Sequence, residues 1–117
     1  MKVHIIGGGN LGVSIALGLS KFSSDNQVTI TRRNTASIQY LEKLGTTVST
    51  NNIHQIQEAD VIILTIKPYQ VDAVLAEILP VISNKIIASA VGGLSIENLQ
   101  NKIGDANTAI RIMPNIA

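Results

Sequence analysis

This chain of 117 residues contains no cysteine and no tryptophan, and its only aromatic residues are one phenylalanine and two tyrosines. The absence of cysteine excludes a disulfide framework, a thiolate zinc site and a thiol nucleophile. The scarcity of aromatic side chains removes the stacking platforms that single-stranded nucleic acid needs. A net charge of +1 gives no basic excess for nucleic acid or for an acidic membrane. The two histidines lack ligand spacing. We therefore expect no nucleic-acid partner and no metal.

Long apolar runs are also missing from the sequence. After Met1-Lys2, only four largely apolar residues precede three consecutive glycines, which is too short for a signal-peptide core or a membrane span. The expectation is a cytoplasmic protein with no membrane partner. The apolar share of 45% is high enough to rule out disorder, and the length allows one domain, residues 1–117.

Strand and helix patterns alternate along the whole chain. The predicted strands, which are short and rich in β-branched residues, are 3–6, 28–31, 47–48, 61–64, 85–89 and 108–113. The predicted helices, which space apolar residues at helical intervals, are 10–22, 36–44, 68–79 and 95–103. Because parallel neighbours need crossover connections, this alternation predicts an α/β fold with a doubly wound, mostly parallel sheet.

The segment from Gly7 to Gly12 fits the G-x-G-x-x-G pattern of dinucleotide-binding loops. In this pattern Gly7 makes the tight turn, Gly9 lets the backbone approach a pyrophosphate, and Gly12 lets the helix pack close to the strand. The N–H groups at the helix N-terminus then bind the phosphates. The segment ends a predicted strand and begins a predicted helix, which favours a Rossmann-type dinucleotide-binding fold over a glycine-rich turn without a ligand.

The end of the second predicted strand indicates which dinucleotide is preferred. An NAD site carries an Asp or Glu there, about 20 residues past the last glycine, which hydrogen-bonds the ribose. Here the sequence is Thr31-Arg32-Arg33-Asn34, and no acid lies between Asp25 and Glu42. Two guanidinium groups suit a 2′-phosphate, so NADP(H) is the expected cofactor. The alternative is that both arginines are solvated surface residues.

Two further loops follow predicted strands at the same edge of the sheet, where ligands bind in open α/β folds. Lys67 can contact the phosphates, a ribose or a substrate, or it is an ordinary exposed lysine before a helix that Pro68 begins. The segment Ala90-Val91-Gly92-Gly93 offers small residues against which a nicotinamide ring can lie, or it is a helix-entry turn.

No catalytic residue is assigned from the sequence. His4 lies inside a predicted strand, where a packed histidine is expected, and His54 lies in a polar, surface-like stretch. Glu58 and Asp60 precede a strand and so lie at the wrong end of the sheet for catalysis.

In these residues, the chain resembles the N-terminal coenzyme domain of the pyrroline-5-carboxylate reductase family, whose members make proline by reducing a cyclic imine with NADPH. The resemblance covers the whole chain. It rests on the opening 5–10 and on 63–68, which is similar to the family's V-K-P segment. It also rests on 88–96, similar to S-x-A-A-G-I-S-I, and on 111–115, similar to R-V-M-P-N.

The resemblance implies a set of dinucleotide contacts, listed here from the pyrophosphate to the ring. They are Gly7, Gly8, Gly9, Asn10 and Leu11 for the pyrophosphate; Arg32 and Arg33 near the 2′-phosphate; Asn52 on the adenosine side; Thr65, Ile66, Lys67, Pro68, Val91, Gly92 and Gly93 on the nicotinamide half; and Met113, Pro114 and Asn115 beside the ring and substrate. Two further cofactor contacts are expected from the residues themselves: Gly12 of the glycine pattern, and Asn34, whose side chain can face the 2′-phosphate. The resemblance also implies a small-molecule substrate, a cyclic imine carboxylate. A homo-oligomer is expected through a helical domain that this chain lacks.

Three departures from the family pattern leave the substrate open. Gly12 stands where many members have alanine, Val91-Gly92 replaces Ala-Ala, and Ile116-Ala117 replaces a Thr-Pro ending. The alternatives are a domain like those of F420-dependent NADP oxidoreductases or β-hydroxyacid dehydrogenases, and a module that binds a dinucleotide without turnover.

Overall fold

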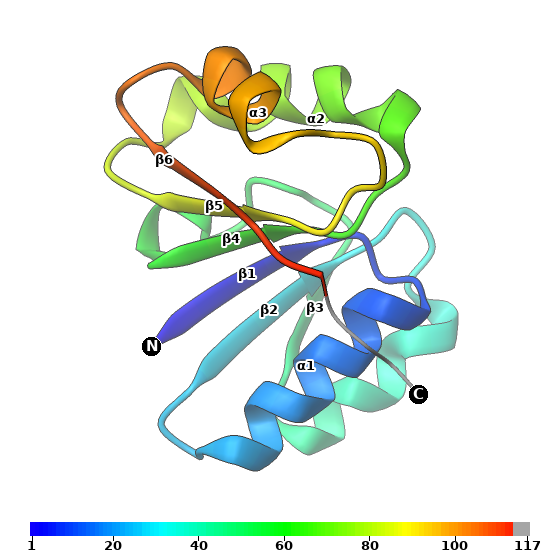
Figure 1. The fold of residues 1–117 in the computed structure, drawn as a ribbon. Coiled ribbons are helices and arrows are strands. Elements are labelled where there is room, and N and C mark those ends of the chain that lie inside the picture. The colour runs from blue at the N-terminus through cyan, green and yellow to red at the C-terminus, as the bar shows by residue number, and fades with distance from the viewer. Residues whose placement is uncertain (114–117) are drawn as a thin grey trace.

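A six-stranded parallel sheet forms the centre of the computed structural model, which describes residues 1–113 (Figure 1). The strands are β1 (Lys2–Ile6), β2 (Gln27–Thr31), β3 (Thr47–Ser49), β4 (Val61–Leu64), β5 (Ile86–Ser89) and β6 (Thr108–Arg111). Their order is β3-β2-β1-β4-β5-β6, and every neighbouring pair is parallel. The winding reverses between β1 and β4, so the crevice at their carboxyl ends is the expected ligand position. The predicted doubly wound α/β fold is confirmed.

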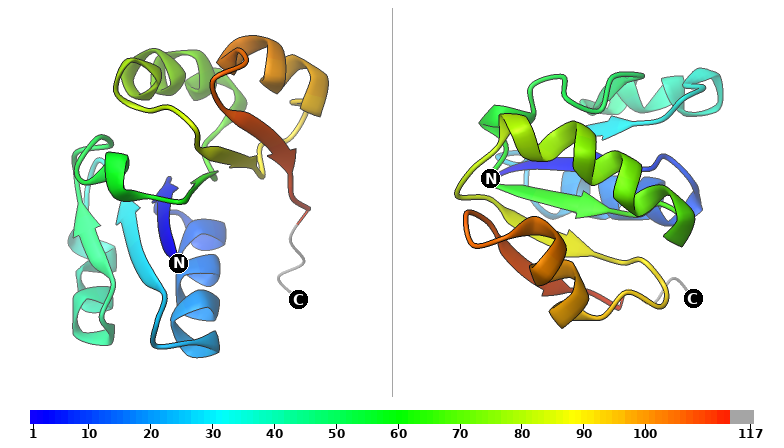
Figure 2. Two further views of the ribbon diagram at one scale, coloured as in Figure 1. Left: turned by 90° about the vertical axis from the view of Figure 1, so that its left-hand side faces the viewer. Right: turned by 90° about the horizontal axis from the view of Figure 1, so that it is seen from above.

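Helices cover both faces of the sheet (Figure 2). The α-helices are α1 (Asn10–Phe22), α2 (Val71–Ile78) and α3 (Ile96–Ile103), and the 3₁₀ segments are η1 (Ala36–Leu44), η2 (Ile56–Glu58), η3 (Pro68–Gln70) and η4 (Leu79–Val81). α1 and η1 pack on one face, whereas α2 and α3 pack on the other. No helix within residues 1–113 is long and apolar enough to cross a membrane.

The alternation of side chains along each strand divides the core into two clusters. In β1, Val3 and Ile5 pack with α1 and η1, while Ile6 packs with the α2 and α3 side. In β4, Ile63 faces the cluster formed with α1 and η1, and Leu64 faces the cluster formed with α2 and α3. Strands covered on both faces need apolar residues at every position, which explains the unbroken run in β4.

The structure differs from the sequence-based prediction in several places. The predicted helix 68–79 is α-helical only in α2, with the 3₁₀ segments η3 and η4 at its two ends. Residues 36–44 form 3₁₀ rather than α-helical turns, and the spacing of three between Ile38, Leu41 and Leu44 matches the three residues per turn of that helix. Leu44 is exposed, however, so only the first two of these residues enter the core. The last predicted strand is also shorter, because β6 ends at Arg111 rather than at Met113.

Candidate functional site

The loop after β1 has a different spatial requirement at each of its glycines. Gly7 has φ +111°, and a Cβ there would lie 2.7 Å from the Thr65 carbonyl oxygen. A Cβ on Gly12 would overlap the Gly7 carbonyl oxygen, so the first turn of α1 packs directly on the loop. A Cβ on Gly9 would meet nothing within 4 Å. Open space beside Gly9 is where a pyrophosphate would approach the backbone in a dinucleotide-binding loop.

The N-terminus of α1 faces this open space without a cap. Gly9 is the N-cap residue, no side chain accepts a hydrogen bond from the first turn, and that turn contains no acidic residue. The N–H of Val13 is the first to find a helical partner, the carbonyl of Gly9 at 3.0 Å. The N–H groups of Asn10, Leu11 and Gly12 are therefore available to an anion, which the helix dipole also favours.

Thr65 ties the loop after β4 to the glycine loop. Its hydroxyl is directed at the carbonyl oxygens of Gly7 at 2.7 Å and of Ile6 at 3.1 Å. Its backbone N–H donates to the Ile6 carbonyl at 2.9 Å. These bonds hold the two carboxyl-terminal loops together at the point where the sheet changes its winding direction.

The two arginines after β2 lie in different environments. The Arg32 side chain crosses the glycine loop, because its Nη1 donates to the Gly8 carbonyl at 3.0 Å and to the Ser37 hydroxyl at 2.9 Å. A Cβ on Gly8 would lie 2.9 Å from the Cβ of Arg32, so a residue with a side chain does not fit at this position without a shift of its neighbours. Arg33 is exposed and its side chain forms no hydrogen bond within residues 1–113. Arg32 therefore supports the loop, while Arg33 is open to a ligand.

Asn34 and Asn52 are both engaged in hydrogen bonds within the protein. The Asn34 side-chain oxygen accepts from the Ala36 N–H at 3.0 Å, at the start of η1. The Asn52 side-chain oxygen accepts from the Thr31 hydroxyl at 2.6 Å, and its carbonyl accepts from the ring of His4 at 2.8 Å. Asn52 thus lies beside Thr31, the last residue of β2, which directly precedes the two arginines.

The predicted residues of the nicotinamide half follow β4 and β5 at the same edge. Lys67 is exposed, and its N–H donates to the Gln70 side chain at 2.9 Å as Pro68 begins η3. Ile66 packs against the core, and Val91 is buried in it, so the segment 91–93 can contact a ligand only through its backbone and the two glycines. Met113 is exposed, and Pro114 and Asn115 lie outside the described residues.

Charge is distributed unequally between the two ends of the sheet. The loops at the carboxyl ends of β1, β2, β4 and β5 carry Arg32, Arg33 and Lys67 and no acidic residue. The carboxylate of Asp60 lies at the opposite end, where it accepts from the Lys2 N–H at 2.8 Å. A cationic edge with free N–H groups suits a polyphosphate ligand. Among residues 1–113 no cluster of three His, Asp or Glu residues can hold a metal ion.

Sequence reasoning missed three contacts that shape this site. These are the Thr65 hydroxyl on the glycine loop, the Arg32 bond to Gly8 and the His4 bond to Asn52. Each joins residues far apart in the chain, so only the strand register could have indicated them. The expected surface position of His54 is confirmed.

Comparisons with known proteins agree with this geometry. Residues 2–93 match the family described as NADP oxidoreductase coenzyme F420-dependent. The chain is 37% identical to pyrroline-5-carboxylate reductase 1 of Dictyostelium discoideum over 98% of its own length and 21% of the relative's. It is 32% identical to pyrroline-5-carboxylate reductase of Pasteurella multocida over 97% of its own length and 44% of the relative's. The chain thus spans less than half the length of these relatives.

Two solved structures have the same fold. A pyrroline-5-carboxylate reductase from Coxiella burnetii superposes with a TM-score of 0.86 at 29% identity, over 97% of this chain and 44% of that one. The Plasmodium falciparum pyrroline carboxylate reductase, solved with NADP bound, superposes with a TM-score of 0.81 at 24% identity, over 98% of this chain and 42% of that one. The resemblance to pyrroline-5-carboxylate reductases is confirmed over nearly the whole chain, which belongs to the family described as NADP oxidoreductase coenzyme F420-dependent.

Proposed function

We propose that this chain binds NADPH as the coenzyme domain of an oxidoreductase that reduces 1-pyrroline-5-carboxylate to proline. The observation that carries the proposal is the open space beside Gly9, in front of the uncapped N-terminus of α1. A pyrophosphate placed there accepts hydrogen bonds from the free N–H groups of the first helical turn. The similarity to pyrroline-5-carboxylate reductases supports the choice of substrate.

The residues after β2 support NADPH over NADH. The position that an acid would occupy for a ribose hydroxyl is held by arginines, of which Arg33 is exposed and without a hydrogen-bonding partner in residues 1–113. A guanidinium binds a phosphate dianion through charge-assisted hydrogen bonds. The 2′-phosphate is then bound by Arg33, while Arg32 keeps the glycine loop in place.

The nicotinamide half is proposed to lie along the loops after β4 and β5. NADPH supplies the hydride that the carbon of the cyclic imine receives. The Lys67 cation lies at the edge of this region, and the glycines at 92 and 93 let the ring approach the backbone. We assign no general acid, because Glu58 and Asp60 lie away from this edge and the His4 side chain is buried.

Catalysis also requires the substrate to be enclosed and oriented against the cofactor. The chain spans less than half the length of its reductase relatives. We propose that a helical domain outside these residues completes the substrate site and forms a homo-oligomer. A small-molecule substrate, without nucleic-acid or membrane partners, and a cytoplasmic location belong to the same proposal.

Calorimetric titration of the chain with NADPH and with NADH tests the binding proposal. NADPH is expected to bind about tenfold more tightly, and Gly9→Val is expected to abolish most of the binding of both. Equal or tighter binding of NADH would contradict the assignment of the arginines. Unchanged binding by Gly9→Val would show that the phosphate loop is assigned wrongly.

A second candidate function follows from the family match itself, whose description names an F420-dependent NADP oxidoreductase. In that case the site beside the nicotinamide takes a deazaflavin instead of a cyclic imine. Because the proposed substrate site is completed outside these residues, assays of NADPH oxidation by the full-length protein with each of the two substrates distinguish them.

A further inference from the structure

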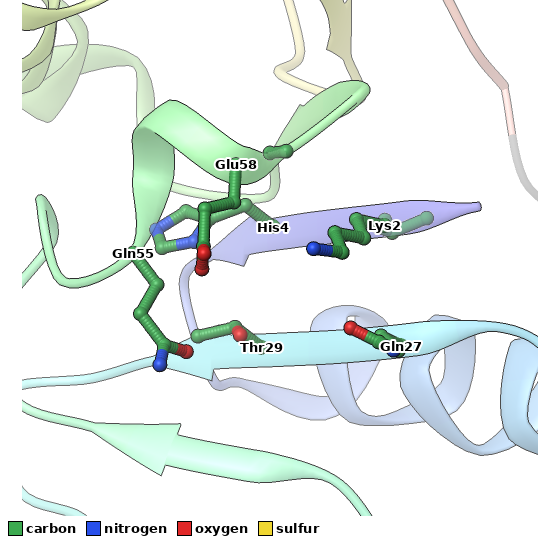
Figure 3. A pocket seen from close by; sticks show the side chains of 8 residues that line it. Lys2, His4, Gln27, Thr29, Gln55 and Glu58 are labelled. Carbon is green, nitrogen blue, oxygen red and sulfur yellow. The ribbon is translucent and has the colours of Figure 1, made fainter.

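His4 occupies an unusual position for a histidine, in the central strand β1 with 1% of its surface exposed. Its ring points out of the sheet toward the segment that connects β3 to β4, beside Gln55 and Glu58 (Figure 3). A cavity of about 30 Å³, large enough for one water molecule, lies between them. The ring Nε2 is 2.8 Å from the carbonyl oxygen of Asn52. A carbonyl only accepts, so this nitrogen carries the proton.

Asn52, whose backbone carbonyl bonds to His4, is held at a second point through its side chain. The Thr31 hydroxyl donates to its Oδ1 at 2.6 Å, a distance typical of an O–H···O bond and short for an N–H donor. Thr31 is fully buried, so its hydroxyl is fixed as well. The amide group of Asn52 is thereby oriented, and its Nδ2 forms no hydrogen bond within residues 1–113. An oriented amide with a free donor points to a ligand acceptor.

The position of this amide indicates which part of a dinucleotide it meets. Thr31 is the last residue of β2, and Arg32 follows it directly. In doubly wound folds the end of the second strand lies beside the adenosine ribose. The Nδ2 donor of Asn52 therefore lies beside the strand end where the adenosine ribose is expected.

We propose that His4 is a positioning residue for the adenosine half of the dinucleotide, acting through its hydrogen bond to the Asn52 carbonyl while Thr31 orients the Asn52 amide. This inference rests on the proposed function. His4 does not need to touch the ligand, because its ring is buried and acts on Asn52 through the backbone carbonyl.

The test compares His4→Leu, which removes the donor but fills similar space, with His4→Gln, which retains a donor. Thr29→Val is the matched control, since Thr29 pairs with His4 across β1 and β2 and lines the same cavity without bonding to Asn52. Dissociation constants are measured for adenosine 2′,5′-bisphosphate, which is the adenosine half of NADPH, and for reduced nicotinamide mononucleotide, which is the other half.

We expect His4→Leu to weaken binding of the bisphosphate about three- to tenfold and to leave the mononucleotide unchanged. His4→Gln is expected to restore much of the loss, and Thr29→Val to bind like the wild type. In an Asn52→Ala background, His4→Leu should have no further effect on the bisphosphate, because both act through one side chain.

A general loss of structure predicts a different pattern. If His4→Leu weakens both ligands equally, or is as damaging in the Asn52→Ala background as in the wild type, the positioning role is overturned. Wild-type affinity in His4→Leu also overturns it and leaves the proposed function standing. If the wild-type chain binds neither NADPH nor the bisphosphate, the proposed function fails and the positioning role fails with it.

Discussion

Arg32 and Arg33 are neighbours in the sequence but are expected to have separate roles. Arg33→Ala should lower the affinity for NADPH about tenfold and leave that for NADH unchanged, because a charge-assisted hydrogen bond contributes about 1.5 to 3 kcal/mol and exposure reduces the gain. Arg32→Ala should weaken both dinucleotides, since Arg32 holds the Gly8 carbonyl. Calorimetric titration with both dinucleotides measures these effects.

Lys21→Ala is the control for a general loss of positive charge, because Lys21 lies in the last turn of α1, at the far end from the glycine loop. It should bind both dinucleotides like the wild type. Equal losses of NADPH affinity in Lys21→Ala and Arg33→Ala would show that net charge, and not a 2′-phosphate contact, sets the affinity.

The stability of the fold is expected to depend on pH through His4. Burial lowers the pKa of His4, and the charge of the nearby His54 lowers it further, while the bond to Asn52 acts in the opposite direction. The unfolded chain therefore takes up a proton first as the pH falls below about 6.5, so stability decreases from there toward the lower folded pKa. Thermal unfolding between pH 7.5 and 5.5 should show this loss.

The variant His4→Gln should flatten the dependence in that range, because it removes the titrating group. His54→Gln is the comparison variant, because it removes only the smaller of the two causes that lower the pKa of His4, so most of the loss of stability should remain. A pH profile of His4→Gln parallel to that of the wild type would show that other groups cause the loss of stability.

In the glycine loop and the first turn of α1, substitutions at different glycines are expected to have different effects: one weakens dinucleotide binding and the other destabilises the fold. Gly9→Val should affect the fold by about 1 kcal/mol at most, because Gly9 has φ −77° and no neighbour within 4 Å of a Cβ. Gly12→Ala should instead destabilise the fold. The Cβ would overlap the backbone carbonyl oxygen of Gly7, which cannot rotate away as a flexible side chain can, so the cost is expected to exceed the helix-propensity gain of about 1 kcal/mol. Urea unfolding of both variants tests this difference.

The contact between the loops after β1 and β4 depends on one hydroxyl group. Thr65→Val should destabilise the protein by about 1 to 3 kcal/mol, because it leaves the Gly7 carbonyl without its donor at 2.7 Å. Thr65→Ser retains the hydroxyl and should retain most of the stability. Equal losses of unfolding free energy in the two variants would show that the methyl group, and not the hydrogen bond, is responsible.

Local sequence patterns were sufficient for the order and type of most elements. The continuous apolar run in β4 and the glycines before α1 are short-range signals, and the structure places both as expected. The spacing of Ile38 and Leu41 predicted a helix but not its 3₁₀ form, because the two helix types share that interval. The path of the segment around Asn52 depends on a histidine 48 residues away, which no local pattern contains.

At the scale of the whole molecule, the chain is expected to bind NADPH without reducing 1-pyrroline-5-carboxylate at an appreciable rate. Orientation of two reactants and exclusion of water can contribute on the order of 7 kcal/mol or more, and the proposed function assigns only the cofactor side to this chain. NADPH oxidation with the cyclic imine measures this, with the full-length Pasteurella multocida reductase as the positive control. Turnover by this chain close to that of the control would show that residues 1–117 contain the whole catalytic site.

Hydrogen exchange at the start of α1 reports on the proposed pyrophosphate site, since the N–H groups of Asn10, Leu11 and Gly12 are assigned to the pyrophosphate. These amides have no helical acceptor in the protein alone, so they should exchange rapidly and become protected when NADPH is added. In Gly9→Val, addition of NADPH should leave their exchange unchanged. Tight NADPH binding that protects other amides, such as those of η2, and leaves the start of α1 unprotected would contradict the account.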